Sequence, residues 1–449
     1  MGSFSVWGAG RRGALTLVLA TASLLVPSEV AAKPTIFDPG TEILRESRPH
    51  ADAYLDAMRD LGADVVRLRP TWRDTDLAQL DYLVAGARTR GMDLLLTPVA
   101  PGARLNFWPD GEITSGPAPA GPTVAEYAAF VAELGRRYPE VHRWAIWNEP
   151  ELPNFFPLPT GAGDTPGRRY RTVFLAAQSA LVASGHRPRE VLLGETHPGP
   201  TLPFLREVLC LNRRWRLRAG CAPLTAGGWA HHPYIIAERP WYMTDDFIGT
   251  GDLPKLNQAL WRAEQAGATR GKLPIYVTEF GVAGSTRFDA EMLSAAEWAM
   301  TRNPWVKSFA QYSLLDDWWQ HGLLRGNASP KWSAIAFTHS VFVIRRGHQA
   351  VVLGHLRTGA GRTSVAVIDR SRSPKRLPVR TDRNGYFKLV TRWRPHRRWC
   401  VAGGMRVRAF GLNPPKRAEG RRKPPVVQPP ATTGQVQPSS QGVAATAAC

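Results

Sequence analysis

Short apolar runs alternate with longer segments of helical periodicity between residues 33 and 340 of this 449-residue chain. Each run is six or seven residues long, and the runs occupy 34–39, 64–70, 92–98, 142–148, 190–195, 227–232, 274–280 and 306–312. This alternation is typical of βα units, which build a parallel sheet. Eight strands in about 300 residues favour a (β/α)8 TIM barrel. An open doubly wound sheet would need a glycine-rich phosphate loop after an early strand, and the sequence has none.

Helix start and stop signals fall between these runs. The letters TVAE at 123–126 form a capping box, and the amphipathic stretch behind it runs to Arg137. Gly91, Gly185 and Gly267 stand where helices are expected to end. The segments between the strands are therefore predicted to be helices.

The pattern changes near residue 341. Short alternating segments such as TSVAVID and GYFKLVTRW follow, and Asn384-Gly385 between two of them predicts a β-hairpin. We expect a small all-β sandwich over 341–413. Residues 414–449 are rich in Pro, Ser and Thr without apolar periodicity, which predicts a disordered tail.

The first 32 residues have the layout of a secretory signal peptide. Arg11 and Arg12 precede the apolar run ALTLVLATASLLV, and small residues at 30–32 supply a cleavage site. That run is too short to span a bilayer comfortably, and no later segment reaches the roughly 20 apolar residues of a membrane helix. We predict a secreted, extracellular protein that begins near Lys33 and has no stable membrane span. An uncleaved membrane anchor is the alternative.

Four cysteines are few for a disulfide scaffold but compatible with an oxidising compartment. Cys210 and Cys221 close the arginine-rich segment LNRRWRLRAG, and we predict a disulfide between them, with two buried thiols as the alternative. The pairing of Cys400 and Cys449 is left open.

The net charge of +20 is unevenly distributed, because residues 341–424 carry 22 Lys and Arg against three acidic residues. No helix-turn-helix, zinc-finger or aromatic RNA-binding pattern accompanies this basic region, so nucleic acid is not an expected partner. The region either binds an anionic envelope polymer or, as we prefer, is a solvated arginine-rich spacer.

Two glutamates end predicted strands on opposite walls of the barrel. Glu149 follows Asn148 in WAIWNEP, at the end of the fourth strand, and Glu279 ends the seventh in YVTEF. Reactive groups of a (β/α)8 barrel lie at the carboxyl ends of its strands. Two carboxylates about 5 Å apart carry out retaining glycoside hydrolysis, one as acid and one as nucleophile. Arg67 and Tyr234 are suitable donors for an ionised nucleophile.

The Asn148-Glu149 pair and Glu279 occur in this order at the ends of the fourth and seventh of eight predicted strands. In this they resemble the clan-A retaining glycosidases, a superfamily of cellulases, mannanases, β-xylosidases and β-galactosidases. The resemblance covers residues 34–340. It implies that Glu149 is the acid/base, that Asn148 binds the 2-hydroxyl of the substrate, and that Glu279 is the nucleophile.

Further segments are similar to motifs of the same superfamily. The segment VVRLRPTW implies that Arg67 supports the nucleophile, with Arg69 on the same side of the strand as the alternative. The segment HHPY implies that Tyr234 orients the nucleophile, with His232 beside it. Glu195, at the end of the fifth strand, is either a functional or a supporting acid.

The sugar-stacking platform is the least defined part of the resemblance. The tryptophan that many cellulases carry after strand eight is not cleanly matched, and Tyr312, Trp318 and Trp319 are the candidates for its position. Trp108, in the loop after the third strand, is the preferred platform residue, because an indole face stacks on a pyranose. Trp72 is a further candidate.

We therefore predict a secreted retaining O-glycosyl hydrolase of polysaccharide catabolism that acts on β-linked oligo- or polysaccharides. The chemistry needs no cofactor, and no closely spaced His, Cys and Asp ligand set predicts a metal. A polysaccharide-remodelling transglycosylase and a catalytically silent carbohydrate-binding envelope protein are the alternatives. The sequence does not decide the sugar, endo or exo action, or the oligomeric state.

Overall fold

The structure is a computed structural model, and it describes residues 33–101, 105–107, 113–115, 121–152, 155–156, 165–234, 246–317, 320–357, 362–368, 375–402 and 407–408. The predicted signal peptide, the predicted tail with Cys449, and the tryptophans Trp108, Trp318 and Trp319 lie outside the described residues.

A parallel sheet of eight strands lies at the centre, in the order β10-β1-β2-β3-β6-β7-β8-β9. Its strands are β1 (Thr35–Asp38), β2 (Val65–Leu68), β3 (Asp93–Leu96), β6 (Trp144–Ala145), β7 (Val191–Thr196), β8 (Gly228–His231), β9 (Ile275–Val277) and β10 (Phe309–Tyr312). All eight predicted strands are confirmed. The sheet closes where the Ile275 N–H donates to Trp305 O and the Lys307 N–H donates to Ile275 O, both at 2.8 Å. The observed fold is the predicted (β/α)8 barrel.

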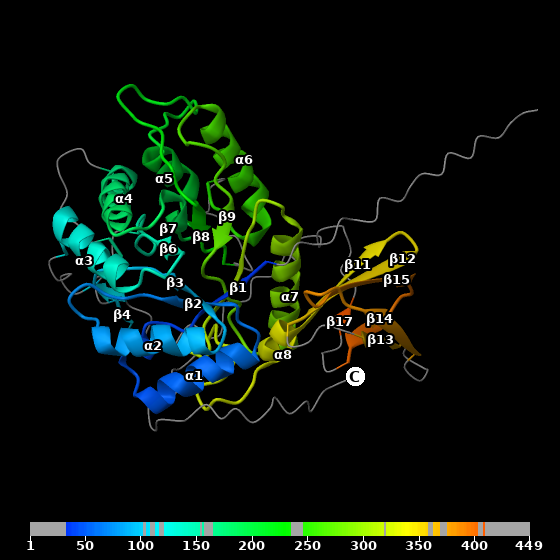
Figure 1. The fold of residues 1–449 in the computed structure, drawn as a ribbon. Coiled ribbons are helices and arrows are strands. Elements are labelled where there is room, and N and C mark those ends of the chain that lie inside the picture. Colours follow the sequence, from blue (N-terminus) through cyan, green and yellow to red (C-terminus); the bar gives the residue numbers. More distant parts are fainter. Residues whose placement is uncertain are drawn as a thin grey trace, which may run out of the picture. The chain divides into compact units, whose positions relative to one another are not determined.

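Helices lie around the outside of the barrel strands (Figure 1). They are α1 (Arg48–Asp60), α2 (Leu77–Thr89), α3 (Val124–Arg137), α4 (Pro166–Ala183), α5 (Thr201–Val208), α6 (Leu253–Gln265), α7 (Arg287–Arg302) and α8 (Trp332–Thr338). A hairpin of β4 (Leu105–Phe107) and β5 (Ile113–Ser115) precedes α3. Thr123 and Glu126 form the predicted capping box of α3. Among the described residues, we find no helix with the length and apolar character to cross a membrane.

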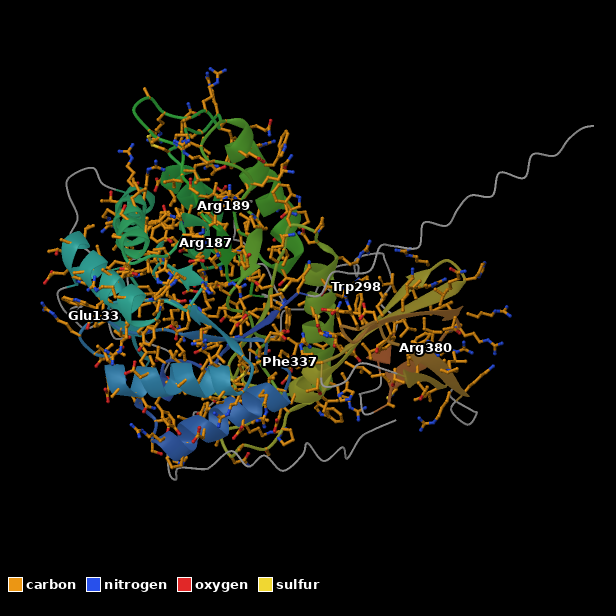
Figure 2. All side chains as sticks on the ribbon, in the orientation of Figure 1. Glu133, Arg187, Arg189, Trp298, Phe337 and Arg380 are labelled. Carbon is orange, nitrogen blue, oxygen red and sulfur yellow. A yellow bond between two sulfur atoms is a disulfide. The ribbon has the colours of Figure 1, made fainter. Side chains whose placement is uncertain are left out.

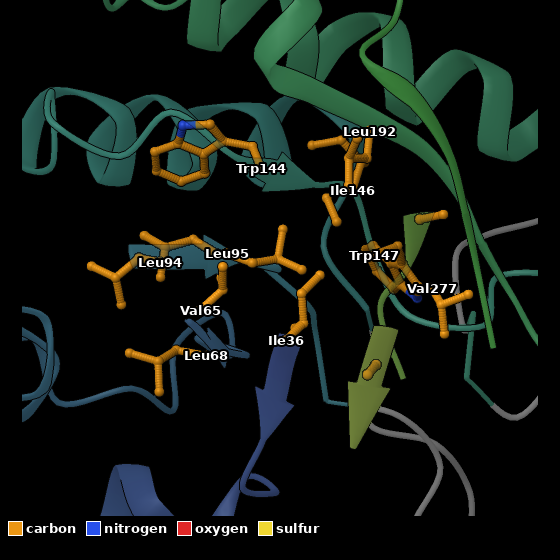
Figure 3. Packing of buried hydrophobic residues seen from close by; sticks show 14 of the residues in the cluster. Ile36, Val65, Leu68, Leu94, Leu95, Trp144, Ile146, Trp147, Leu192 and Val277 are labelled. Atoms are coloured by element: carbon orange, nitrogen blue, oxygen red, sulfur yellow. The ribbon is translucent and has the colours of Figure 1, made fainter. Parts of the chain in front are cut away.

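Apolar side chains fill the space between the strands and the helices. Figure 3 shows residues of this cluster, among them Ile36, Leu95 and Trp144, which are fully buried. Burying a large aliphatic or aromatic side chain contributes about 1.5–3 kcal/mol. Strands that are covered on both faces read as continuous apolar runs, which is why they stood out in the sequence.

Two antiparallel sheets follow the barrel, in the orders β11-β12-β15 and β14-β13-β16-β17. The strands are β11 (His339–Arg346), β12 (Gln349–Leu356), β13 (Arg362–Ile368), β14 (Lys375–Arg380), β15 (Tyr386–Arg392), β16 (Arg398–Val401) and β17 (Val407–Arg408). Val343 and Val352 of one sheet share a buried cluster with Val365 and Trp399 of the other. The small all-β domain is therefore present.

The predicted hairpin at Asn384-Gly385 is wrong. A turn forms there, and Gly385 has a positive φ of 82°, but β14 and β15 on either side of it belong to different sheets. The side chain of Asp382 accepts the N–H groups of Asn384 and Tyr386, both at 2.9 Å. This Asx turn redirects the chain from one sheet to the other, because Asn-Gly favours a local turn and does not itself choose the strand partners.

Glu297 of α7 is a buried anchor between the barrel and the first strands of the small domain. Its carboxylate accepts from His355 Nδ1 at 2.7 Å and from Arg357 Nη2 at 2.5 Å. Burial acts to raise the pKa of Glu297, but Arg357 and His355 outweigh it and lower the pKa to about 2. Glu297 is therefore ionised and stabilising over most of the pH range.

We predict that Glu297→Gln lowers the free energy of unfolding by about 3–5 kcal/mol at neutral pH, because it leaves the buried Arg357 without its charge partner. The stabilisation is present above the ordinary glutamate pKa of 4.5 and is lost as the pH falls towards about 2. Denaturant unfolding should therefore show a difference between variant and wild type that shrinks with falling pH. The control is Glu133→Gln, on the outer surface of α3 (Figure 2), which should change the stability little at any pH.

Candidate active site

Arg67 on β2 is the centre of a polar cluster at the carboxyl ends of the barrel strands. Its side chain is fully buried, and its guanidinium group donates to acceptors from five other strands or strand ends. The acceptors are Asp38 Oδ2 (2.5 Å), Glu279 Oε2 (2.7 Å), Asn148 Oδ1 (2.8 Å), Thr97 Oγ1 (3.2 Å) and Glu195 Oε2. A guanidinium has five N–H groups, so every donor of Arg67 is used.

The chain leaves β6 in an unusual backbone conformation. The strand ends at Ala145, earlier than predicted, and Trp147 and Glu149 have positive φ angles of 69° and 46°. Glu195 at the end of β7 also has a positive φ, 52°, and its carbonyl accepts the Glu149 N–H at 2.9 Å. Such conformations cost about 1–3 kcal/mol each in non-glycine residues and cluster at functional sites. The prediction that the fourth strand continues to Asn148 was wrong in this respect.

Tyr170 of α4 joins the ends of β6 and β7 beneath these two glutamates. Its hydroxyl donates to Ile146 O and accepts the Gly194 N–H, both at 2.9 Å, and the side chain is fully buried. No local pattern indicates this role, because a buried tyrosine on a helix resembles any other core residue.

Glu279, just beyond β9, is surrounded by donors. Arg67 Nη1 and the Tyr234 hydroxyl donate to its two oxygens at 2.7 and 2.5 Å, and Arg69 Nη1 lies 3.8 Å away. Burial acts to raise the pKa of Glu279, but the positive charges of His232 and the two arginines outweigh it and hold the pKa well below its usual value. Glu279 is therefore ionised.

His232 lies between the carboxylates. Its Nδ1 is 3.0 Å from Glu149 Oε1 and 3.9 Å from Glu279 Oε2, and its Nε2 is 3.1 Å from Glu195 Oε2. Burial acts to lower the pKa of His232, but the three carboxylates outweigh it and raise the pKa to about 10. His232 is therefore an imidazolium that donates from both nitrogens. His231 points elsewhere, towards Ile248 O.

The two predicted catalytic carboxylates lie close together. One ligand atom from each of Glu149, His232 and Glu279 lies within 4.8 Å of the others. This set has the residue types of a metal site. It does not suit a cation, however, because both His232 nitrogens face carboxylates and Arg67 and Arg69 already neutralise Glu279.

Six predicted site residues therefore meet in one cluster: Arg67, Asn148, Glu149, His232, Tyr234 and Glu279. Tyr312 lies at the edge of the cluster, where its hydroxyl donates to Asp317 at 2.8 Å and its ring faces Arg69. Trp72 packs against the barrel core and under Arg73. The preferred platform residue Trp108 and the candidate Trp318 lie outside the described part of the chain.

Sequence reasoning missed three members of the site. Asp38 is fully buried, and its carboxylate forms ion pairs with both Arg67 and Arg69. His321 packs between the rings of Tyr234 and Tyr312, with centroid distances of 5.2 and 6.3 Å. Asp38 ends β1, so its position at a strand end was the signal that could have found it.

Glu151 is the third member of the site that sequence reasoning missed. It is 7% exposed and follows Glu149 by two residues. Within the part of the chain that the structure describes, neither of its carboxylate oxygens has a hydrogen-bond partner. Burial and the nearby Glu149 raise the pKa of Glu151 well above its usual value. Burial and the charge of Glu149 therefore favour the uncharged form of Glu151.

Cys210 and Cys221, distant from this cluster, are joined by a disulfide, as the sequence predicted. Cys400 is buried in β16.

No family model and no curated protein matches the chain. Among solved structures, it resembles a GH30 endoxylanase from Clostridium papyrosolvens C71, with 13% identity over 80% of this chain and 94% of that one and a TM-score of 0.46. A family 51 α-L-arabinofuranosidase from Bifidobacterium longum is 12% identical over 80% and 93%, with a TM-score of 0.44. An endo-β-1,4-mannanase from Thermotoga petrophila is 11% identical over 86% and 100%, with a TM-score of 0.38.

We predict that Tyr170→Phe destabilises the protein by about 1–3 kcal/mol, because it leaves the buried Ile146 carbonyl and Gly194 N–H without partners. Hydrogen exchange at the Gly194 amide should become faster than in wild type. The matched control is Tyr127→Phe, which also removes a buried hydroxyl, in this case the donor to Pro98 O. If exchange at Gly194 rises equally in both variants, Tyr170 does not specifically join the two strand ends.

Proposed function

We propose that the protein is a retaining glycoside hydrolase that acts on β-linked sugars. The observation that carries the proposal is the pair Glu149 and Glu279, whose nearest oxygens lie within 4.8 Å of each other in unequal surroundings. Retaining enzymes place two carboxyl groups about 5–5.5 Å apart, whereas inverting enzymes leave room for a water at about 6.5–9.5 Å.

The surroundings of the two carboxylates assign their roles. Glu279 receives Arg67 and Tyr234 and is held ionised, as a nucleophile must be. Glu149 contacts neither of these donors and instead faces His232. Two titratable groups in such different environments take the two roles of acid and base chemistry. We therefore assign Glu279 as nucleophile and Glu149 as acid/base.

The reaction then proceeds in two displacements. Glu279 attacks the anomeric carbon while Glu149 donates its proton to the departing oxygen, which leaves a glycosyl ester on Glu279. Glu149, now a carboxylate, removes a proton from water, and the water oxygen attacks the anomeric carbon and releases Glu279. Both inversions together retain the configuration, and no cofactor is needed.

Asn148 supports this assignment through its amide. Its Oδ1 accepts from Arg67 at 2.8 Å, which fixes the orientation of the side chain. The Nδ2 group is then the part that remains for a ligand, and we assign it to the 2-hydroxyl of the sugar. Hydrogen bonds to this hydroxyl strengthen in the transition state of such reactions.

We also propose that the protein is exported. Support comes from the order of a basic start, a short apolar run and small residues in positions 1–32. A disulfide between Cys210 and Cys221 is consistent with an oxidising compartment.

Alanine variants of the two glutamates should differ in a way that tests the mechanism. We predict that Glu149→Ala slows hydrolysis of aryl glycosides with poor leaving groups by about 10²–10⁴-fold. Dinitrophenyl glycosides, whose leaving group needs no proton, should be affected much less. Glu279→Ala should lose hydrolysis of both kinds of substrate.

Added azide gives a stereochemical readout for this prediction. In Glu149→Ala, azide should attack the glycosyl ester on Glu279 in place of water and form the β-glycosyl azide. In Glu279→Ala, azide should attack the substrate in place of the missing carboxylate and form the α-azide. Glu133→Ala serves as a control at an exposed position. Equal activity of wild type and Glu279→Ala on every hydrolysed substrate would refute the proposal.

The acid side of the pH profile should depend on Tyr234. Glu279 has to be ionised, so kcat/KM falls when Glu279 becomes protonated. Tyr234→Phe removes a donor that lowers the pKa of Glu279, so we predict that the acid limb moves to higher pH. Tyr312→Phe is the matched control, because its hydroxyl donates to Asp317 instead. An acid limb that stays in place in Tyr234→Phe would contradict the assignment of Glu279.

A further inference from the structure

The connection between α5 and β8 carries a dense basic patch. It contains the segment 210–221, which we call the arginine loop, and it leads into the amino end of β8. The candidate active site lies at the carboxyl ends of the strands, so the arginine loop belongs to the opposite end of the barrel. In Figure 1 it is the green loop that extends beyond α5.

The arginine loop has a fixed conformation. The disulfide between Cys210 and Cys221 closes it. The side chain of Asn212 accepts the N–H groups of Arg214 and Arg216 at 2.8 and 3.1 Å, which holds the turn at its tip. These internal bonds fix the backbone from which the arginine side chains project.

An aromatic contact attaches the loop to two helices. The Trp215 ring lies 5.6 Å from the Arg206 guanidinium of α5 and 5.9 Å from the Arg262 guanidinium of α6. These cation–π contacts add two further positive charges beside the loop.

The charge of the loop is unbalanced, although the barrel as a whole is not. Residues 33–340 hold 33 Lys and Arg and 33 Asp and Glu, yet no acidic residue occurs between 208 and 237. The loop arginines are Arg213, Arg214, Arg216 and Arg218. In the described structure none of these four pairs with a carboxylate.

Arginines elsewhere on the barrel behave differently. Exposed arginines in or just before α2 pair with carboxylates, as in Arg73 with Glu126 at 3.0 Å and Arg88 with Glu140 at 3.0 Å. The same end of the barrel also carries Arg189, between α4 and β7, and Arg270, between α6 and β9. The Arg189 side chain donates a 3.4 Å hydrogen bond to the Arg270 carbonyl. The positive field at this end therefore extends beyond the loop itself.

We propose that the arginine loop binds an anionic polysaccharide through its carboxylate or sulfate groups. Guanidinium groups bind such oxyanions with paired hydrogen bonds, and a loop that is already ordered loses little freedom on binding. A polymer held at this end leaves the candidate active site open to its own substrate. The choice of a polysaccharide over another polyanion rests on the proposed glycosidase function.

The test compares two full-length triple variants of equal charge. Arg213→Gln, Arg214→Gln and Arg216→Gln change the arginine loop, whereas Arg45→Gln, Arg88→Gln and Arg136→Gln remove three exposed arginines elsewhere on the barrel. Binding to immobilised dextran sulfate, polygalacturonate, neutral dextran and duplex DNA is measured at low and at physiological salt, and thermal unfolding confirms that both variants fold.

We expect the loop variant to bind the sulfated or the carboxylated polymer about tenfold more weakly than wild type. Its affinity should also fall less than that of wild type between low and physiological salt. The control variant should stay within about twofold of wild type, and neutral dextran should bind none of the proteins. The two anionic polymers distinguish a sulfate from a carboxylate ligand.

Equal weakening in both variants would overturn the proposal, because net charge alone would then explain the binding. Unchanged binding of the loop variant, or loop-dependent binding to duplex DNA alone, would overturn it as well. Binding is read independently of hydrolysis, so failure of the proposed activity in the glutamate variants is a separate result. The loop variant should hydrolyse small aryl glycosides as wild type does.

Discussion

One buried guanidinium group holds the ends of six barrel strands in register. Arg67 of β2 has partners from β1, β7 and the residues that follow β3, β6 and β9. A cation in a place without water is tolerated only when it is surrounded by acceptors, and this one uses each of its N–H groups. The positions of Asn148, Glu195 and Glu279 therefore depend on the same side chain.

The strands, and the two glutamates that follow strands and meet in the cluster, could be predicted because their signals are local. A strand covered on both faces is a short apolar run, and a glutamate at its end interrupts that run. The arrangement around them could not be predicted to the same degree. The partners of Arg67 come from segments up to 212 residues apart, and no local pattern records which of them meet.

Backbone conformation accounts for the other differences between expectation and structure. The positive φ angles of Trp147, Glu149 and Glu195 occur in residues that do not favour them, so composition gives no warning. The two hydrogen bonds by which Tyr170 joins the ends of β6 and β7 are tertiary contacts, and no local sequence pattern predicts them either. In the small domain, Asn384-Gly385 marked a turn correctly, but the choice between sheets was made by the packing of β14 and β15 against their own partners.

The charges around Glu149 are nearly balanced, which has a consequence for the second half of the proposed reaction. The cations Arg67, Arg69 and His232 face the carboxylates of Asp38, Glu195 and Glu279. When Glu279 becomes an ester, one negative charge disappears and the cluster has an excess of one positive charge. That positive excess lies beside Glu149, 3.0 Å from His232, in the step for which the proposed mechanism needs a base. The net charge of the cluster therefore differs between the first and the second displacement of the proposed reaction.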